Sequence, residues 1–238
     1  MKIDKRKTYV LVIDVETTNN TDITDKKAPN DGLCYDVGYG VYDKQGNEYI
    51  AKSYAVSEIF FDKDLMDSAY YKDKLPKYYE ELKKGTRQVK NICAIRREIK
   101  EVVKKYDIKE IYAYNASFDN TTLNNTIRLV TGSMARYFFP FGTEICDIWH
   151  IACQVLGLQK TFQWENIRNE KGNLKTSAER MFAYMSSNEN FEEEHIGLAD
   201  VRIEAQILAR CFKSHKSINK KINRACWRIP QKASKKEA

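Results

Sequence analysis

The chain has 238 residues, of which 42% are hydrophobic and 31% are charged, and its formal net charge is +7. These values are typical of a single folded domain with one substantial core, and they require no second domain. The chain has no run of 18 apolar residues and its first residues are mostly polar, which argues against a membrane span or a signal peptide. We therefore expect a soluble, cytoplasmic protein with no membrane partner.

The first predicted strand, residues 8–16, is apolar and β-branched up to Asp14, which is typical of a central strand buried on both faces. Side chains alternate along a strand, so Asp14 and Glu16 project to the same face, about 6.6–7 Å apart along the chain. One metal ion could therefore bind both carboxylates. Such a pair alone is more often a solvated strand end, so the metal site depends on which other residues accompany it.

An insert, a hairpin and a helix follow the first strand. The insert, at about residues 19–33, is rich in Asp, Asn and Lys and is longer than common connections. We expect a loop there, and a flap over a substrate is the alternative. The hairpin has a strand at residues 35–43 and a turn at Gln45-Gly46, and apolar spacing predicts a helix over residues 92–103 that packs on the sheet.

A second buried strand, residues 110–114, precedes a predicted helix over residues 117–130. Ser117 is the expected N-cap of this helix, and Gly132 is its expected C-terminal stop. Asp119 then lies in the first helical turn. The helix dipole favours a carboxylate there whether or not the carboxylate binds a metal.

The chain then continues the alternation of strands and helices that is typical of an α/β fold. The predicted elements are a strand at residues 143–146, a helix at 147–156 ended by Gly157, a loop at 159–175 and a helix that ends near 185. Thr176 and Glu179 have the spacing of a capping box, which predicts the start of that last helix.

The last helical pattern covers residues 196–211 and would hold Asp200 on a fixed support. His195 lies five residues before Asp200, and five residues at 3.6 per turn point about 140° apart. The two side chains therefore cannot face one point from the same regular helix, and we expect His195 on the segment before the helix. An imidazole beside a carboxylate suits a general base near neutral pH, although a lone His near a helix start is more often a cap or a surface residue.

Charge is unevenly distributed along the chain. Residues 213–238 contain nine Lys and Arg and one Glu, and a second basic stretch covers residues 83–109. Such clusters attract phosphate backbones, and the alternatives are a solvated helix face and a frayed end. Trp227 in the tail could stack on a base or anchor the tail to the core.

The acidic run at residues 189–194 should repel a phosphate backbone. We expect an exposed loop there, and the alternative is a mobile loop that keeps His195 away from the site until substrate binds.

The six cysteines have neither a C-x-x-C pair nor the spacing of a zinc site, and they lie among aliphatic neighbours. We expect small buried thiols rather than a disulfide framework. They are Cys34, Cys93, Cys146, Cys153, Cys211 and Cys226.

In their order along the chain, the acidic segments resemble the three motifs of the DEDDh family. These are 3′-to-5′ exonucleases that include polymerase proofreading subunits, RNase T and oligoribonuclease. The resemblance spans roughly residues 8–212, and the hairpin at 35–43 is similar to the second and third strands of the family. The matching pieces are Asp14-x-Glu16-Thr17-Thr18, Asn115-x-x-Phe118-Asp119, and His195 followed five residues later by Asp200. The resemblance implies an RNase H-like mixed β-sheet flanked by helices, with an exonuclease domain at residues 1–212 and a basic extension at 213–238.

The resemblance also implies a role for each residue. Two ions, Mg²⁺ or Mn²⁺, would be held by the carboxylates, since a two-metal site needs several carboxylates at one point. Asp14, Glu16 and Asp200 would hold the ion that activates water. Asp14 would bridge to the second ion, and Asp119 would reach that ion directly or through water. His195 would be the general base, and the substrate contacts would come from Thr17, Thr18, Asn115 and Phe118.

We therefore expect a metal-dependent 3′-5′ exonuclease that hydrolyses single-stranded DNA ends to nucleoside 5′-monophosphates. Trimming of RNA 3′ ends is an alternative with the same chemistry, and the sequence does not decide between them. A non-catalytic nucleic-acid-binding module is an alternative of a different class, and the competent residues at all five catalytic positions argue against it. The expected partner is single-stranded nucleic acid, with DNA favoured over RNA. A proofreading role would need a separate polymerase or replication partner, which the sequence does not identify.

Overall fold

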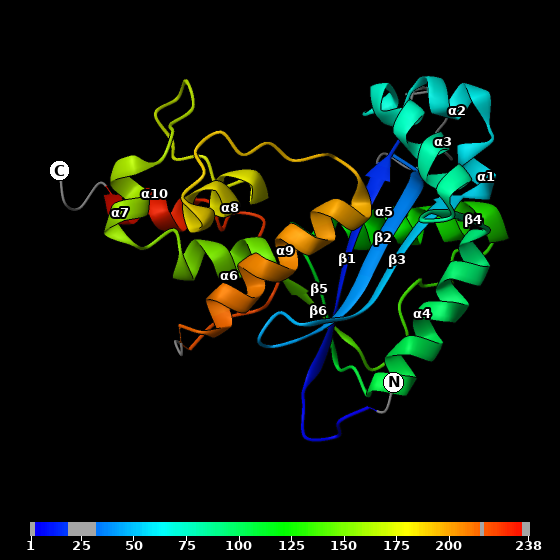
Figure 1. Cartoon of the computed structure of the whole chain (residues 1–238), viewed down its shortest axis with the longest axis horizontal. Coiled ribbons are helices and arrows are strands. Elements are labelled where there is room, and N and C mark those ends of the chain that lie inside the picture. Colours follow the sequence, from blue (N-terminus) through cyan, green and yellow to red (C-terminus); the bar gives the residue numbers. More distant parts are fainter. Residues whose placement is uncertain (1–2, 19–31, 215–216, 235–238) are drawn as a thin grey trace.

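The structure is a computed structural model that describes residues 3–18, 32–214 and 217–234. Its centre is a six-stranded sheet with the strand order β4-β3-β2-β1-β5-β6 (Figure 1). Strand β2 is antiparallel to β1 and β3, whereas β1, β5 and β6 are parallel, as are β3 and β4. The strands are β1 (Tyr9–Thr17), β2 (Cys34–Asp43), β3 (Glu48–Val56), β4 (Gln88–Lys90), β5 (Glu110–Ala113) and β6 (Glu144–Asp147).

Helices flank the sheet on both faces, which confirms the predicted mixed β-sheet flanked by helices in an α/β fold (Figure 1). The α-helices in the described part of the chain are α1 (Ser57–Phe60), α2 (Lys63–Asp67), α3 (Leu75–Lys84), α4 (Ile92–Tyr106), α5 (Ala116–Thr131), α6 (Ile148–Val155), α7 (Lys160–Glu165), α8 (Ala178–Ser186), α9 (Gly197–Phe212) and α10 (Arg228–Ser234). Among these helices, not one combines the length and the apolar character that a membrane crossing requires.

Strand β1 is buried on both faces, as predicted, because alternate residues belong to two different apolar clusters. Leu11 and Ile13 pack in the cluster that includes residues of α4 and α5, while Val10 and Val12 pack in the cluster that includes α6 and α9. A register slip of one residue would exchange these faces, so the two apolar layers hold the strand in one register. Asp14 continues the series of Val10 and Val12 and therefore lies on the α9 face.

The helices predicted at 92–103, 117–130, 147–156 and 196–211 are confirmed as α4, α5, α6 and α9, with ends that differ by a few residues. The predicted stop at Gly132 is also confirmed, because this glycine is the C-cap of α5 with a φ of +64°.

The predicted N-cap of α5 is wrong by two residues. Asn115 occupies the cap position in the left-handed region, with a φ of 63°, and Ser117 lies in the first turn. Asn115 makes no side-chain cap hydrogen bond, and its own backbone nitrogen donates to the carboxylate of Asp147 from the neighbouring strand β6 (3.2 Å), so a tertiary contact fixes where the helix begins.

The predicted capping box of α8 is wrong by one residue. Ser177 is the N-cap, and its hydroxyl accepts from the Arg180 nitrogen (3.4 Å). The Thr176 hydroxyl instead accepts a hydrogen bond from the indole of Trp149 (2.9 Å). Because this tertiary contact occupies Thr176, the next residue, Ser177, caps the helix.

The predicted loop at residues 159–175 is wrong in part, because α7 lies within it. This helix has six residues and one fully buried aromatic anchor, Phe162, so it is too short to show a helical period in the sequence. Beyond it, Arg168 and Leu174 form an isolated antiparallel bridge.

The predicted insert falls on residues 19–31, which lie outside the described residues, and on residues 32–33 at its end. Its flanks are joined, since the Thr18 nitrogen donates to the Leu33 carbonyl (2.9 Å) and the Leu33 nitrogen donates to the Thr18 hydroxyl (3.2 Å). The insert therefore leaves and re-enters the fold at one point, beside the end of β1.

All six cysteines are free thiols. Five of them are buried, as predicted, and Cys93 is partly buried.

Candidate active site

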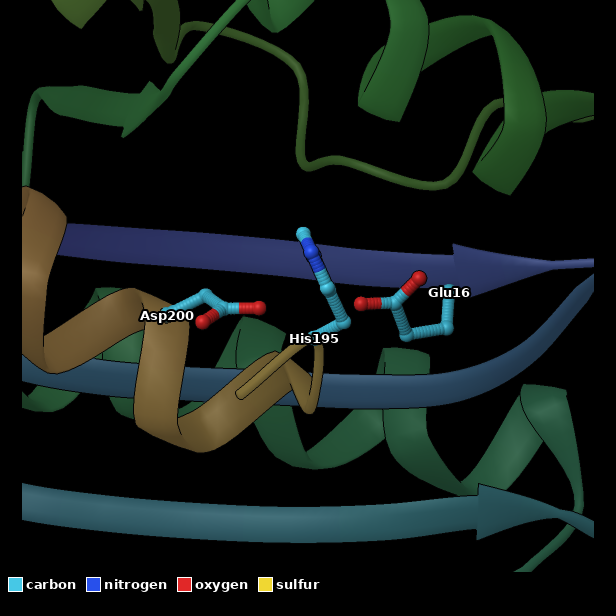
Figure 2. Close-up of side chains that lie close together, drawn as sticks. All are labelled: Glu16, His195 and Asp200. Carbon is cyan, nitrogen blue, oxygen red and sulfur yellow. The ribbon is translucent and has the colours of Figure 1, made fainter. Parts of the chain in front are cut away.

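Glu16, His195 and Asp200 converge beside the C-terminal end of β1. Each offers a ligand atom within 4.8 Å of those of the other two. Figure 2 shows the carboxylates of Glu16, from β1, and Asp200, from α9, pointing toward one another, with His195 between them. Three segments that are far apart in the sequence thus contribute to one group of possible metal ligands.

A hollow of about 690 Å³ surrounds this group. Seven of the nine predicted site residues line it: Asp14, Glu16, Thr17, Thr18, Phe118, His195 and Asp200. Asp119 lies behind the wall and is buried, and its charge contributes to the raised pKa of both Asp14 and Glu16. Asn115 faces a neighbouring hollow instead, which it shares with Phe118.

The close approach of α9 to β2 requires two glycines. A Cβ atom on Gly38 would lie 2.2 Å from the carbonyl carbon of Gly197, and one on Gly197 would lie 2.8 Å from the nitrogen of Gly38. Because neither residue has a Cβ, the first turn of α9 lies directly on the strand that pairs with β1. This contact brings Asp200 to the two acids of β1.

A buried polar network anchors the same turn. Asp36 of β2 accepts hydrogen bonds from the Gly197 nitrogen (3.1 Å) and the Tyr78 hydroxyl (2.8 Å), and it forms an ion pair with Arg87. The side chains of Asp36 and Arg87 are both fully buried. Breaking such a pair leaves an uncompensated buried charge, so the network holds α9, β2 and the residues after α3 in one arrangement.

His195 lies before α9, as predicted, and has a φ of 53°, in the left-handed region. Its imidazole stacks on the ring of Tyr71, with the ring centroids 4.2 Å apart and the planes 6° from parallel. Burial lowers the pKa of His195 below its usual value, and Lys74 acts in the same direction, against the opposing charges of Glu179 and Asp73. The imidazole is therefore neutral near pH 7 and able to accept a proton.

The carboxylates have the properties of a site that binds divalent cations. Three buried oxygens, Asp14 Oδ2, Asp119 Oδ2 and Asp200 Oδ1, have no hydrogen-bond partner in the described part of the chain. Such atoms are costly to bury unless a ligand pairs with them. Carboxylate oxygens brought to one point are the donors that Mg²⁺ and Mn²⁺ prefer, so these acids fit the ions that the sequence implies.

Crowding of these acids changes their protonation. Burial, followed by the charges of Asp36 and Asp200, raises the pKa of Glu16 to about 9. Burial and the charge of Glu193 raise the pKa of Asp200 to about 8. The pKa of Asp14 lies well above its usual range for the same reasons, namely burial and then the charges of Glu204 and Glu16. A cation bound among these groups would replace protons.

Glu204 is a further carboxylate in the hollow, and it was not predicted from the sequence. Glu204 is buried on α9, and its carboxylate accepts a hydrogen bond from the Tyr114 nitrogen (3.3 Å). Burial, followed by the charge of Asp119, raises its pKa well above the usual range. The available signal was spacing, because Glu204 lies four residues after Asp200 and so on the same helix face.

The acidic run before His195 is only partly an exposed loop. Glu192 and Glu194 are exposed, and Glu194 forms an ion pair with Lys77. Glu193 is directed into the hollow, where burial and the charge of Glu179 raise its pKa to about 7. No periodicity in the run predicted which of the acids would turn inward.

No protein-family model matches the chain, and no curated protein matches it by sequence. Solved structures do match. The nuclease domain of 3′hExo, a DEDDh family member solved with rAMP, has a TM-score of 0.56 at 11% identity, over 92% of this chain and 98% of that one.

Exonuclease I of E. coli, solved with a dA16 oligonucleotide, has a TM-score of 0.53 at 12% identity over 87% of this chain. The same enzyme solved with dT13 has a TM-score of 0.51 at 12% identity, over 86% of this chain and 41% of that one. The chain spans 43% of the length of Exonuclease I in the dA16 complex. The protein thus has the fold of the DEDDh-family exonucleases.

Proposed function

We propose that the protein is a metal-dependent 3′-5′ exonuclease that releases nucleoside 5′-monophosphates from single-stranded DNA ends. The observation that carries this proposal is the set of three buried carboxylate oxygens without partners, beside a neutral imidazole that faces the same hollow. The oligonucleotide complexes of Exonuclease I, which shares the fold, support a single-stranded nucleic acid as the substrate.

Asp14, Glu16, Asp119 and Asp200 would hold two divalent ions, which would acidify a water molecule and stabilise the attacking and leaving oxygens of the phosphodiester. His195 would accept the proton of that water at its imidazole nitrogen. Tyr71 would hold the imidazole plane by stacking, and Phe118, whose ring is 40% exposed, would stack on the terminal base. Thr17 and Thr18 line the hollow and would meet the terminal nucleotide, although the Thr17 carbonyl already accepts from the Tyr70 nitrogen (3.1 Å) and the Thr18 hydroxyl is already bonded to Leu33.

The RNA alternative has one specific observation in its favour, because 3′hExo was solved with rAMP. DNA and RNA strands of the same sequence differ at the 2′-hydroxyl, so a preference would appear as a ratio of rates. A non-catalytic module would bind strands without hydrolysis in Mn²⁺. A cytoplasmic location stays a prediction from the sequence, and a polymerase or replication partner would be needed only for a proofreading role.

The decisive experiment is digestion of 5′-labelled DNA and RNA strands of one sequence, with Mg²⁺, Mn²⁺ or EDTA. We expect a ladder that shortens from the 3′ end, only with metal, and faster for DNA. Strands labelled at the 3′ end should release a labelled mononucleotide at once. Strand cleavage in EDTA at the rate seen with Mn²⁺ would contradict a metal-dependent site.

A second experiment separates the base from the ligands. His195→Ala should lower the single-turnover rate by about 10²–10⁴-fold. It should leave Mn²⁺ affinity, measured by calorimetric titration, within about threefold of the native value, because the carboxylates are retained. An unchanged rate would remove the general-base role from His195 while leaving the carboxylate site intact.

A further inference from the structure

The basic C-terminal segment does not fray over its described residues but folds against α6. The Lys220 carbonyl accepts from the Asp147 nitrogen (2.8 Å), and the Lys221 carbonyl lies 2.7 Å from the imidazole of His150. Cys226 is fully buried in the apolar cluster that contains α6 and α9. The backbone around residue 224 is thereby held in place, next to the first turn of α5.

This placement directs Arg224 to a residue beside the acidic site. Its guanidinium donates two hydrogen bonds to the Ser117 hydroxyl, from Nε (3.0 Å) and from Nη2 (2.8 Å). Ser117 precedes Phe118 and lies two residues before Asp119. The acceptor is neutral, and Arg224 is exposed and has no carboxylate partner in the described part of the chain, so its positive charge is uncompensated.

A second hollow, of about 360 Å³, opens at this arginine. Its lining consists of Asn115, Ser117, Phe118, Thr121, Trp149 and Arg224. Phe118 lines both this hollow and the acidic one, so the two adjoin at that ring. The acidic hollow is lined by five carboxylates, whereas the second is lined by none and has a cation, two aromatic rings and neutral hydrogen-bonding groups.

The geometry points to a subsite for the nucleotide upstream of the one that is removed, with Arg224 contacting a backbone phosphate and an aromatic ring contacting the base. This inference rests on the proposed function, and it adds a position and a residue to it. Here the arginine lies next to the exposed Phe118 and the half-buried Trp149. Arginine beside accessible aromatic rings is the combination that binds single-stranded nucleic acid without reading its sequence. The Ser117 hydroxyl holds the guanidinium in the hollow at little electrostatic cost, and it leaves Nη1 free for a phosphate oxygen.

The test is strand binding in EDTA, where hydrolysis does not contribute. A fluorescein-labelled dT strand of about ten nucleotides is titrated with protein at several salt concentrations. Arg224→Gln should weaken binding by about 5–10-fold and reduce the slope of log K against log salt by about 0.7, the value for one phosphate contact on a single strand. Arg224→Lys should keep the slope and recover part of the affinity, because it retains the charge but not the planar fork.

Arg228→Gln is the matched control, since it removes the same charge from the same segment at a position outside the hollow. It should leave affinity and slope unchanged. Binding of thymidine 5′-monophosphate, which occupies only the terminal position, should not respond to Arg224→Gln. The upstream subsite would be overturned by any of three results. Arg224→Gln and Arg228→Gln could lose equal strand affinity, or Arg224→Gln could keep the native salt slope. The third result is that Arg224→Gln weakens mononucleotide binding as much as strand binding.

Thermal unfolding in EDTA distinguishes a subsite from a folding defect, since Arg224→Gln should unfold within about 2 °C of the native protein.

The failure of the proposed function would look different from the failure of the subsite. A native protein that binds the strand as described but never hydrolyses it with Mn²⁺ would contradict the proposed function. The Arg224 subsite would stand in that case.

Discussion

Two aspartates at opposite ends of the β1–β2 pair have opposite surroundings. Asp43 accepts hydrogen bonds from Lys7 (2.8 Å), the Tyr49 hydroxyl (2.9 Å) and the Asn47 nitrogen (3.0 Å). Asp14 keeps one buried oxygen that has no partner among the described residues. Burial acts to raise the pKa of both, but the donors around Asp43 hold its pKa below the usual range, whereas that of Asp14 lies well above it.

This difference separates carboxylates that stabilise the fold from carboxylates that are available to a ligand. Asp43 closes the turn between β2 and β3, and Asp36 has Arg87, Tyr78 and the start of α9 around it. Asp14 and its neighbours are buried close to one another with too few donors, which destabilises the ligand-free protein. A protein that retains such a cluster uses it for binding or catalysis more often than for stability.

The largest expected effect comes from Asp14→Asn. Loss of one shared ligand should lower the single-turnover rate with Mn²⁺ by at least about 10³-fold, or about 4 kcal/mol of transition-state stabilisation. The free energy of unfolding in EDTA should stay equal or rise, because the amide needs no proton to be buried, whereas the Asp14 carboxyl, with its raised pKa, must hold one. If Asp14→Asn were both slow and clearly less stable without metal, Asp14 would stabilise the fold as Asp43 does, and the distinction between structural and ligand-binding carboxylates would fail.

Asp36→Asn should have the opposite signature. It removes the buried charge partner of Arg87 and leaves that guanidinium only the partly exposed Glu81 (3.0 Å), so urea unfolding in EDTA should show a loss of about 3 kcal/mol. Asp4→Asn is the control, because the ion pair of Asp4 with Arg6 is exposed and its loss should leave the stability nearly unchanged. Equal stability changes in the two variants would show that the buried pair does not anchor α9.

The acidic site should make the ligand-free protein less stable as pH rises. In the unfolded chain these carboxyls titrate near their usual pKa of about 4, whereas the folded chain raises the pKa of Glu16 to about 9 and of Asp200 to about 8. The folded state therefore binds more protons between about pH 4 and 9, and stability falls as pH rises through that window. Each such proton contributes about 1.4 kcal/mol per pH unit, so for these two carboxyls we expect a loss of about 2–3 kcal/mol per pH unit between pH 6 and 7, from urea unfolding in EDTA.

Saturating Mn²⁺ should flatten this dependence, because the ion takes the place of the protons. In Asp14→Asn the slope in EDTA should also be shallower. A stability that rises with pH over the same range in EDTA would show that the acids are ionised and paired in the folded protein.

The smallest expected effect is that of Asp43→Asn. The side chain keeps one acceptor oxygen but loses its charge toward Lys7, so stability should fall by about 1 kcal/mol. The rate of strand digestion should not change at a temperature where the variant is folded, because Asp43 lies at the other end of β1 from the acids. A rate loss without a stability loss would mean that Asp43 is part of the nuclease site.

Local sequence was sufficient to place much of the candidate site. The alternation of side chains along β1 put Asp14 and Glu16 on one face, and helical geometry put His195 outside α9, where the structure has it. These inferences depend on periods of two and 3.6 residues, which hold within a single element. Helix ends were less certain, because Asn115 and Ser177 are the N-caps in place of Ser117 and Thr176, and the Thr176 hydroxyl is occupied by a hydrogen bond from Trp149 of another helix.

Tertiary structure alone decided which further residues meet these acids. The partner of Asp36 is 51 residues away, that of Glu204 is 90 residues away and that of Ser117 is 107 residues away. The sequence contained the glycines that let α9 approach β2, yet nothing near either glycine indicated the other. Secondary structure follows from short-range periodicity, whereas the partner of a buried charge depends on how distant segments pack, and that is a property of the whole fold.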